Sequence, residues 1–141
     1  MDSVISIFKE RIKQAAKAGH TLRIQGGNTK HFYGEHTASF DVLDTREYAG
    51  VVSYEPSELV VTVRAGTPLM QLEQLLFTQG QCLAYEPPHF GASATVGGMV
   101  AAGLAGPARA NVGGVRDHVL GAKLIPLGKL KDRIGELEKY R

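Results

Sequence analysis

The sequence predicts an α+β fold in which helices pack on a small mixed sheet, and three observations support this prediction. Apolar residues recur at helical spacing in two segments. Short β-branched runs, bounded by turn residues, alternate with those segments. The 141 residues are 43% hydrophobic, which is enough for one domain with its own core. No repeat and no linker divides the chain, so we expect one domain over residues 1–125.

The first third of the chain contains one helix and two short strands. Residues 3–18 are predicted to be helical, because their apolar side chains fall on one face and Gly19 can end the helix. A strand over Thr21–Gln25 follows and leads into the glycine turn at residues 26–29. After a polar stretch, Phe40–Leu43 is predicted to be a short strand.

The middle of the chain predicts a hairpin and a second helix. Two strands flank a turn at Glu55–Ser57, and Leu59–Val63 has the apolar, β-branched composition of a buried strand. The second helix is predicted to open at Thr67, with Pro68 at its first position, and to end at Gly80. Its apolar face consists of Leu69, Leu72, Leu75 and Leu76. Another strand is expected over Gln81–Tyr85.

The charge of the chain argues against nucleic acid as a partner. The formal net charge is +2, but residues 1–125 hold 11 Lys and Arg against 11 Asp and Glu. Residues 126–141 hold five basic and three acidic residues and supply the whole excess. A nucleic-acid surface would need a basic patch or stripe. Any anion bound by residues 1–125 must therefore be held mostly by backbone dipoles and a few selected side chains.

The sequence predicts a cytoplasmic protein without a metal site. Cys82 is the single cysteine, no apolar run reaches the length of a transmembrane helix, and the first residues lack a signal-peptide core. No histidine pairs with Cys82 or a carboxylate at ligand spacing. The five histidines are His20, His31, His36, His89 and His118. Covalent attachment of a cofactor through His31 or His89 is disfavoured.

The glycine turn at residues 26–29 has two interpretations. It reads Gly26–Gly27–Asn28–Thr29 and directly follows an apolar strand. A plain hairpin turn would use Asn and Gly because both accept positive φ. Alternatively, the loop wraps an anion with its backbone amides, and a bulky residue at Gly27 would then resist a positive φ and block the phosphate. Arg23, just before the loop, could pair with a phosphate or with a surface carboxylate.

A second glycine-rich segment covers residues 91–125. Eight of the 17 glycines lie between Gly91 and Gly121, and Arg109 is the only Lys, Arg, Asp or Glu between Pro87 and Val115. Close helix packing on a sheet would explain such small residues. A cofactor wall is the alternative, with a turn at residues 94–98 and a short helix from Met99 to Ala105 whose N-terminus faces an anion. The spacing matches neither a Rossmann fingerprint nor a P-loop.

Three stretches together resemble the FAD-binding PCMH-type flavoproteins of the vanillyl-alcohol oxidase group, and within it the small FAD-binding subunits of glycolate oxidases. They are RIQGGNTK, SYEPSELVVTVRAGTPLMQLEQLL and EPPHFGASATVGGMVAAGLAGPARANVGGVRDHVLGAKLI. The resemblance runs from about Ile5 to Ile125. It implies FAD as the cofactor and a PCMH-type FAD-binding domain, of which residues 1–125 would be the N-terminal part.

The resemblance also implies roles for individual residues. The 26–29 loop would hold the FAD pyrophosphate, residues 91–98 would line the flavin, and later residues would close the site near the adenine or ribose. The implied cofactor-binding residues are Gly26, Gly27, Asn28, Thr29, Gly91, Ala94, Thr95, Val96, Gly97, Gly98, Gly103, Gly106, Arg109, Gly114, Asp117 and Val119. No catalytic residue is implied.

The function implied by the resemblance is oxidation of a 2-hydroxy acid, such as glycolate to glyoxylate. A second flavoprotein subunit and an iron–sulfur subunit would be the partners, and they could hold the cytoplasmic chain at the inner membrane. Family members are longer, and residues 126–141 form an atypical tail with Leu130, Ile134 and Leu137 at the spacing of a short amphipathic helix. The alternative is therefore a truncated, inactive fold fragment that acts at most as an interaction module.

Overall fold

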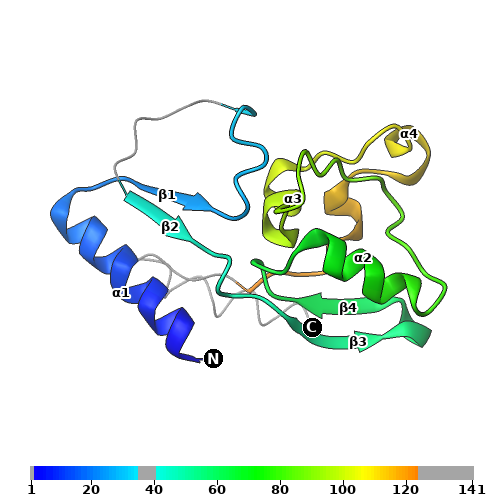
Figure 1. The fold of residues 1–141 in the computed structure, drawn as a ribbon, viewed down its shortest axis with the longest axis horizontal. Helices are drawn as coiled ribbons and strands as arrows, with labels where there is room; N and C mark the ends of the chain where they lie inside the picture. The colour runs from blue at the N-terminus through cyan, green and yellow to red at the C-terminus, as the bar shows by residue number, and fades with distance from the viewer. Residues whose placement is uncertain (1, 35–40, 124–141) are drawn as a thin grey trace. The chain divides into compact units, whose positions relative to one another are not determined.

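The computed structural model describes residues 2–34 and 41–123, and its helices and strands follow the expected α+β order (Figure 1). Its described residues divide into two compact units, one of residues 2–23, 41–43 and 121–123 and one of residues 24–34 and 44–120. The tail predicted over residues 126–141 lies outside the described residues, as does Phe40. Within the described ranges, no helix is both long and apolar enough to cross a membrane.

The first unit is built around helix α1, Asp2–Ala18. Its apolar positions Phe8 and Ala15 are buried, and Gly19 ends the helix with a left-handed φ of 69°. Strands β1, Leu22–Gln25, and β2, Asp41–Asp44, form a two-stranded sheet. The guanidinium of Arg11 donates a hydrogen bond of 2.8 Å to the carbonyl of Val42, which ties α1 to β2.

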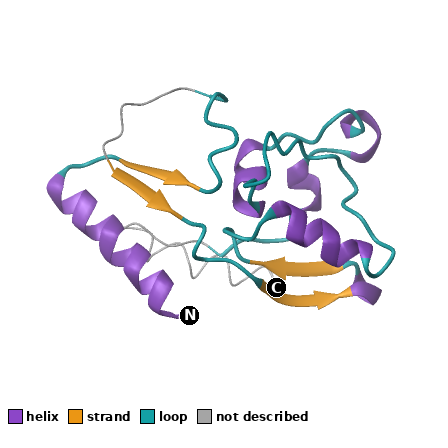
Figure 2. Cartoon of the chain, in the orientation of Figure 1, coloured by secondary structure: helices purple, strands orange, loops and turns teal. Residues whose placement is uncertain are grey.

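The second unit contains the predicted hairpin. Strands β3, Val51–Glu55, and β4, Val60–Val63, pair antiparallel, with Glu55 opposite Val60 and an irregularity in the register between Val51 and Ser53. A 3-10 turn over Pro56–Glu58 joins them, at the place where the sequence predicts a turn. The described strands thus form two separate two-stranded sheets, β1 with β2 and β3 with β4 (Figure 2).

Helix α2, Leu69–Phe77, supplies most of the core of this unit. Leu69, Leu72 and Leu76 are buried, as their spacing predicts, and they pack with Val96 and Met99 of the next helix. The helix begins at Leu69 and not at Thr67, because Pro68 is extended and the Thr67 hydroxyl is held by the Arg64 carbonyl at 2.6 Å.

Two predicted elements after α2 are corrected. Gln81–Tyr85 is not a strand: Gln81 hydrogen-bonds to the Tyr54 hydroxyl and the Pro56 carbonyl, and the Tyr85 side chain enters the core. The helix expected from Met99 to Ala105 is α3, Val96–Ala102. It begins three residues earlier because Thr95 caps it. It ends earlier because Gly103 takes a left-handed φ of 64°.

Two short helical turns follow α3. Helix α4 covers Arg109–Val112, and a 3-10 turn covers Val115–His118. Val115 is buried in the same core as α2 and α3. The segment after α3 therefore enters the core of the second unit through Ala105 and Val115, while its other described residues remain partly or fully exposed.

Candidate functional site

The two glycine-rich segments meet in the second unit. The Ser93 hydroxyl donates a hydrogen bond of 2.8 Å to the carbonyl of Gly27, across 66 residues of sequence. A Cβ added to Gly27 would overlap the backbone of Ser93, and one added to Gly26 would overlap the hydroxyl of Thr95. Both positions are therefore restricted to glycine because another segment occupies the space that a side chain would need.

A third contact closes the same junction. A Cβ on Gly91 would lie 3.1 Å from the Thr29 methyl carbon, and Gly91 itself has a φ of 150°. At the base of the loop, the Gln25 carbonyl accepts hydrogen bonds from both the amide and the hydroxyl of Thr45. The loop is thus anchored at its start and packed along its length.

The backbone angles at this junction correct the expectation that Gly27 has a positive φ. Neither Gly26 nor Gly27 has a positive φ. The residue in the left-handed region is Asn28, with a φ of 57°, and asparagine is among the few side chains that accept it. The two glycines are required by close packing of chain on chain, and the turn itself depends on the asparagine.

Several backbone N–H groups at the junction lack a hydrogen-bond acceptor within the described part of the chain. Within the described part of the chain, no protein atom accepts a hydrogen bond from the N–H groups of residues 26–30, nor from those of residues 91–93. Residues 26, 27, 29 and 30 are half-buried, whereas Asn28 and residues 91–93 are exposed, so these N–H groups are open to an external acceptor or to water. Consecutive unpartnered N–H groups suit an anion with several oxygens, such as a diphosphate.

The residues just after this run are bonded within the protein. The amide of Val96 donates to the Thr67 carbonyl at 2.9 Å, and that of Gly97 donates to the Ala65 carbonyl at 2.7 Å. The amide of Gly98 donates to the Thr95 hydroxyl at 3.2 Å. The first three N–H groups of α3 are therefore satisfied, and the free amides lie before the helix and not at its N-terminus.

The other predicted residues make local contacts. Gly106 packs against the backbone of Glu86, whose amide donates to the Ala105 carbonyl at 3.0 Å. The Asp117 carboxylate accepts a hydrogen bond of 2.7 Å from the amide of Gly114. Arg109, Asp117 and Val119 are exposed, and Gly103 caps α3 with open space around it. The structure thus brings together Gly26–Thr29, Gly91 and Thr95, and it holds the later residues by separate contacts.

Sequence reasoning gave no individual role to three side chains at the junction, Ser93, Lys30 and Phe90, although Ser93 lies within the 91–98 segment expected to line the flavin. Ser93 makes the hydrogen bond that joins the segments. The Lys30 ammonium lies 5.9 Å from the centre of the Phe90 ring, and Phe90 packs edge-on against Phe32 at 5.1 Å. Lys30 was visible in the sequence as the only basic residue within three positions after the glycine pair. The contact between Phe32 and Phe90 had no sequence signal.

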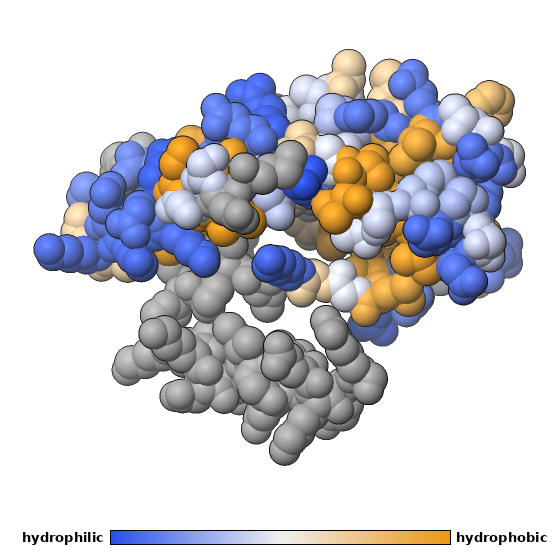
Figure 3. All heavy atoms as spheres, turned by 90° about the horizontal axis from the view of Figure 1, so that it is seen from below, coloured by the Kyte–Doolittle hydropathy of each residue, from blue (hydrophilic) through white to orange (hydrophobic). Residues whose placement is uncertain are grey.

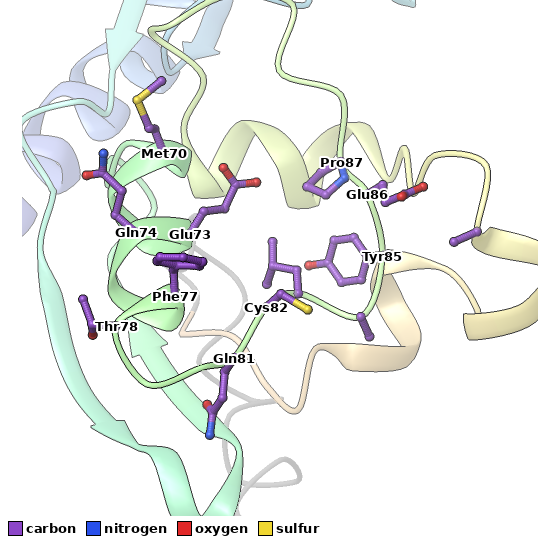
Figure 4. A pocket seen from close by; sticks show the side chains of 13 residues that line it. Met70, Glu73, Gln74, Phe77, Thr78, Gln81, Cys82, Tyr85, Glu86 and Pro87 are labelled. Carbon is purple, nitrogen blue, oxygen red and sulfur yellow. The ribbon is translucent and has the colours of Figure 1, made fainter.

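A separate apolar groove of about 980 Å³ lies beside α2 (Figure 4). Met70, Phe77, Cys82 and Tyr85 are among its lining residues, and burial raises the pKa of Tyr85. None of the predicted cofactor-binding residues lines it. Apolar surface is also visible among hydrophilic residues in the space-filling view (Figure 3). The groove has no convergent set of donors for a charged ligand, so the loop junction is the stronger candidate site.

Comparison with known proteins gives the family of this domain. Residues 7–130 match the family model described as FAD binding domain. The chain therefore belongs to this FAD-binding family, and FAD is its cofactor. The unpartnered N–H groups of the two contacting segments suit a diphosphate group such as that of FAD.

Individual relatives agree with this assignment. The chain is 50% identical over 116 residues to "Glycolate oxidase subunit GlcE" of Escherichia coli (strain K12), a match that covers 82% of this chain and 33% of the relative. The chain thus spans about a third of that protein. Structures of alkyldihydroxyacetonephosphate synthase in two crystal forms match with a TM-score of 0.59 at 22% identity, over 77% of this chain and 21% of theirs. They show the same fold.

Proposed function

We propose that this chain is the FAD-binding part of a flavin-dependent oxidoreductase of the glycolate oxidase type. The observation that carries the proposal is the junction of two unpartnered amide runs, residues 26–30 and 91–93. The identity of 50% to a glycolate oxidase subunit supports the choice among flavoenzymes. Because residues 1–125 carry no net charge, we expect the anionic cofactor to be held mostly by the backbone amides of this junction and by a few selected side chains.

The residues divide into two roles in this proposal. Gly26, Gly27, Asn28 and Thr29 offer their N–H groups to the diphosphate of FAD, and Gly91 begins the facing run. Residues 94–98 support that run, because the amides of Ala94, Val96, Gly97 and Gly98 are bonded to the protein and Thr95 fills the space beside Gly26. Residues further along continue the wall toward the rest of the cofactor. They are Gly103, Gly106, Arg109, Gly114, Asp117 and Val119.

The proposed reaction is oxidation of a 2-hydroxy acid such as glycolate to glyoxylate. Bound FAD would supply the redox chemistry by accepting a hydride equivalent from the substrate. The chain's own part is to bind and orient the cofactor. We assign no catalytic residue, because the loops act through backbone amides. A second flavoprotein subunit and an iron–sulfur subunit are the proposed partners, with the cytoplasm or its membrane surface as the place of action.

The visible spectrum of the purified chain tests the proposal. A yellow protein, or one that takes up added FAD with quenching of its fluorescence, is the expected result. Anaerobic addition of glycolate should then bleach the flavin band, in the presence of the partner subunits if the chain alone does not turn over. A folded, colourless chain that binds no added FAD would overturn the proposal and leave the inactive fold fragment as the better description.

A further inference from the structure

Lys30 is a basic residue at the junction of the two amide runs, and the described part of the chain gives it no carboxylate partner. Its ammonium takes part in no ion pair or hydrogen bond there, and its side chain is half-buried. The amide of Lys30 itself ends the first run of unpartnered N–H groups. A half-buried cation without a counter-ion carries a desolvation cost, and accordingly burial lowers the pKa of Lys30.

The position of the ammonium is fixed by the second segment. It lies 5.9 Å from the centre of the Phe90 ring, at the distance of a cation–π contact. Phe90 takes a strained left-handed φ of 54° and is held edge-on by Phe32. The next residue, Gly91, packs against Thr29 and opens the second amide run. The charge of Lys30 is therefore positioned where the two runs meet.

We propose that Lys30 supplies the positive charge that neutralises the FAD diphosphate, with Phe90 as its positioning residue. This inference rests on the proposed function and deepens it. The amides stabilise the anion by partial charges, and the ammonium adds a full positive charge. Phe90 acts through Lys30 by keeping the flexible side chain over the ring.

The test compares charge variants in binding of FAD and of riboflavin, which lacks phosphate. Lys30→Gln should raise the Kd for FAD about tenfold, as expected for loss of a charge-assisted contact, and leave the Kd for riboflavin unchanged. Lys30→Arg should keep most of the affinity. Lys9→Gln, at an exposed residue of α1, removes the same charge and serves as the matched control. Its Kd for FAD should stay within about twofold of the unmodified value, since salt screens an exposed charge.

Salt dependence and a double variant separate a direct role from a structural one. The FAD affinity of the unmodified chain should fall with added NaCl, and Lys30→Gln should flatten that dependence. Phe90→Leu should raise the Kd about threefold, but have no further effect in the Lys30→Gln background.

The outcomes separate this proposal from the one on which it rests. If the unmodified chain binds FAD and Lys30→Gln leaves its Kd and salt dependence intact, the role of Lys30 is refuted and the FAD site stands. Equal weakening of FAD and riboflavin would also refute it, as a general loss of structure. Absence of FAD binding by the unmodified chain would remove both proposals.

Discussion

The two groups of glycines in this chain look alike in the sequence but have different physical causes. Gly26 and Gly27 have ordinary backbone angles, and glycine is required because Thr95 and Ser93 occupy the space of a side chain. Gly80 and Gly103 have left-handed φ values of 67° and 64°, and nothing lies within 4 Å of a Cβ added to either. The first pair serves contact between distant segments, and the second pair ends helices.

This difference between the two kinds of glycine indicates which positions should be sensitive to substitution for FAD binding. A side chain at a helix-ending glycine costs backbone strain but displaces no neighbour. A side chain at the junction must push apart the two runs of amides that form the candidate site. Substitution of a junction glycine should therefore lower FAD affinity most, whereas substitution of a glycine after a helix should mainly lower stability. Variants of each kind test this difference.

The largest effect is expected for Gly27→Val. The new Cβ would overlap the carbonyl of Ser93, so the loop must move away from its partner segment and lose the hydrogen bond from the Ser93 hydroxyl. Overpacking of this kind costs roughly 3 kcal/mol, which corresponds to about a hundredfold loss in FAD affinity if it falls on the bound state. Fluorescence titration measures the affinity, and circular dichroism shows whether the chain remains folded. An unchanged Kd in a folded Gly27→Val chain would contradict the role of this junction.

A smaller effect is expected for Thr95→Val, which keeps the shape of the side chain beside Gly26 and removes the hydroxyl. The amide of Gly98 then loses its acceptor at the start of α3. Loss of such a cap costs about 1 kcal/mol, and thermal unfolding should shift down by about 3–5 °C in a domain of this size. Thr95→Ser keeps the cap and is the matched control. If both variants unfold at the same temperature, the cap does not contribute.

Most of the fold could be predicted from the sequence because its elements have local signals. The periodicity around Phe8 and the leucines of α2 reflect one buried face each, and the structure confirms both. The strand predicted over Gln81–Tyr85 was wrong, because a short run with four apolar residues is equally compatible with a loop that inserts Tyr85 into the core. Whether such a run becomes a strand depends on the presence of a neighbouring strand edge, and the periodicity of the sequence gives no information about that.

The candidate site was only partly predictable, for a related reason. The family resemblance implied that the 26–29 loop and the 91–98 segment belong to one site, and the structure places them in contact. Whether each glycine is needed for its φ or for close packing depends on neighbours 66 residues away. The aromatic contact between Phe32 and Phe90 likewise arises from the tertiary fold. FAD binding by individual residues stays a prediction.

The smallest effect, and the sharpest comparison, comes from Gly103→Ala beside Gly80→Ala. The two residues have nearly the same φ and open surroundings, so each alanine should lower the free energy of unfolding by about 1 kcal/mol through backbone strain alone. Only Gly103 is proposed to continue the cofactor wall, and a methyl group there should raise the Kd for FAD about twofold to threefold. Urea unfolding and FAD titration of both variants measure the two quantities. If FAD affinity is equal in the two variants, Gly103 is an ordinary helix end, and the wall formed by this chain stops at α3.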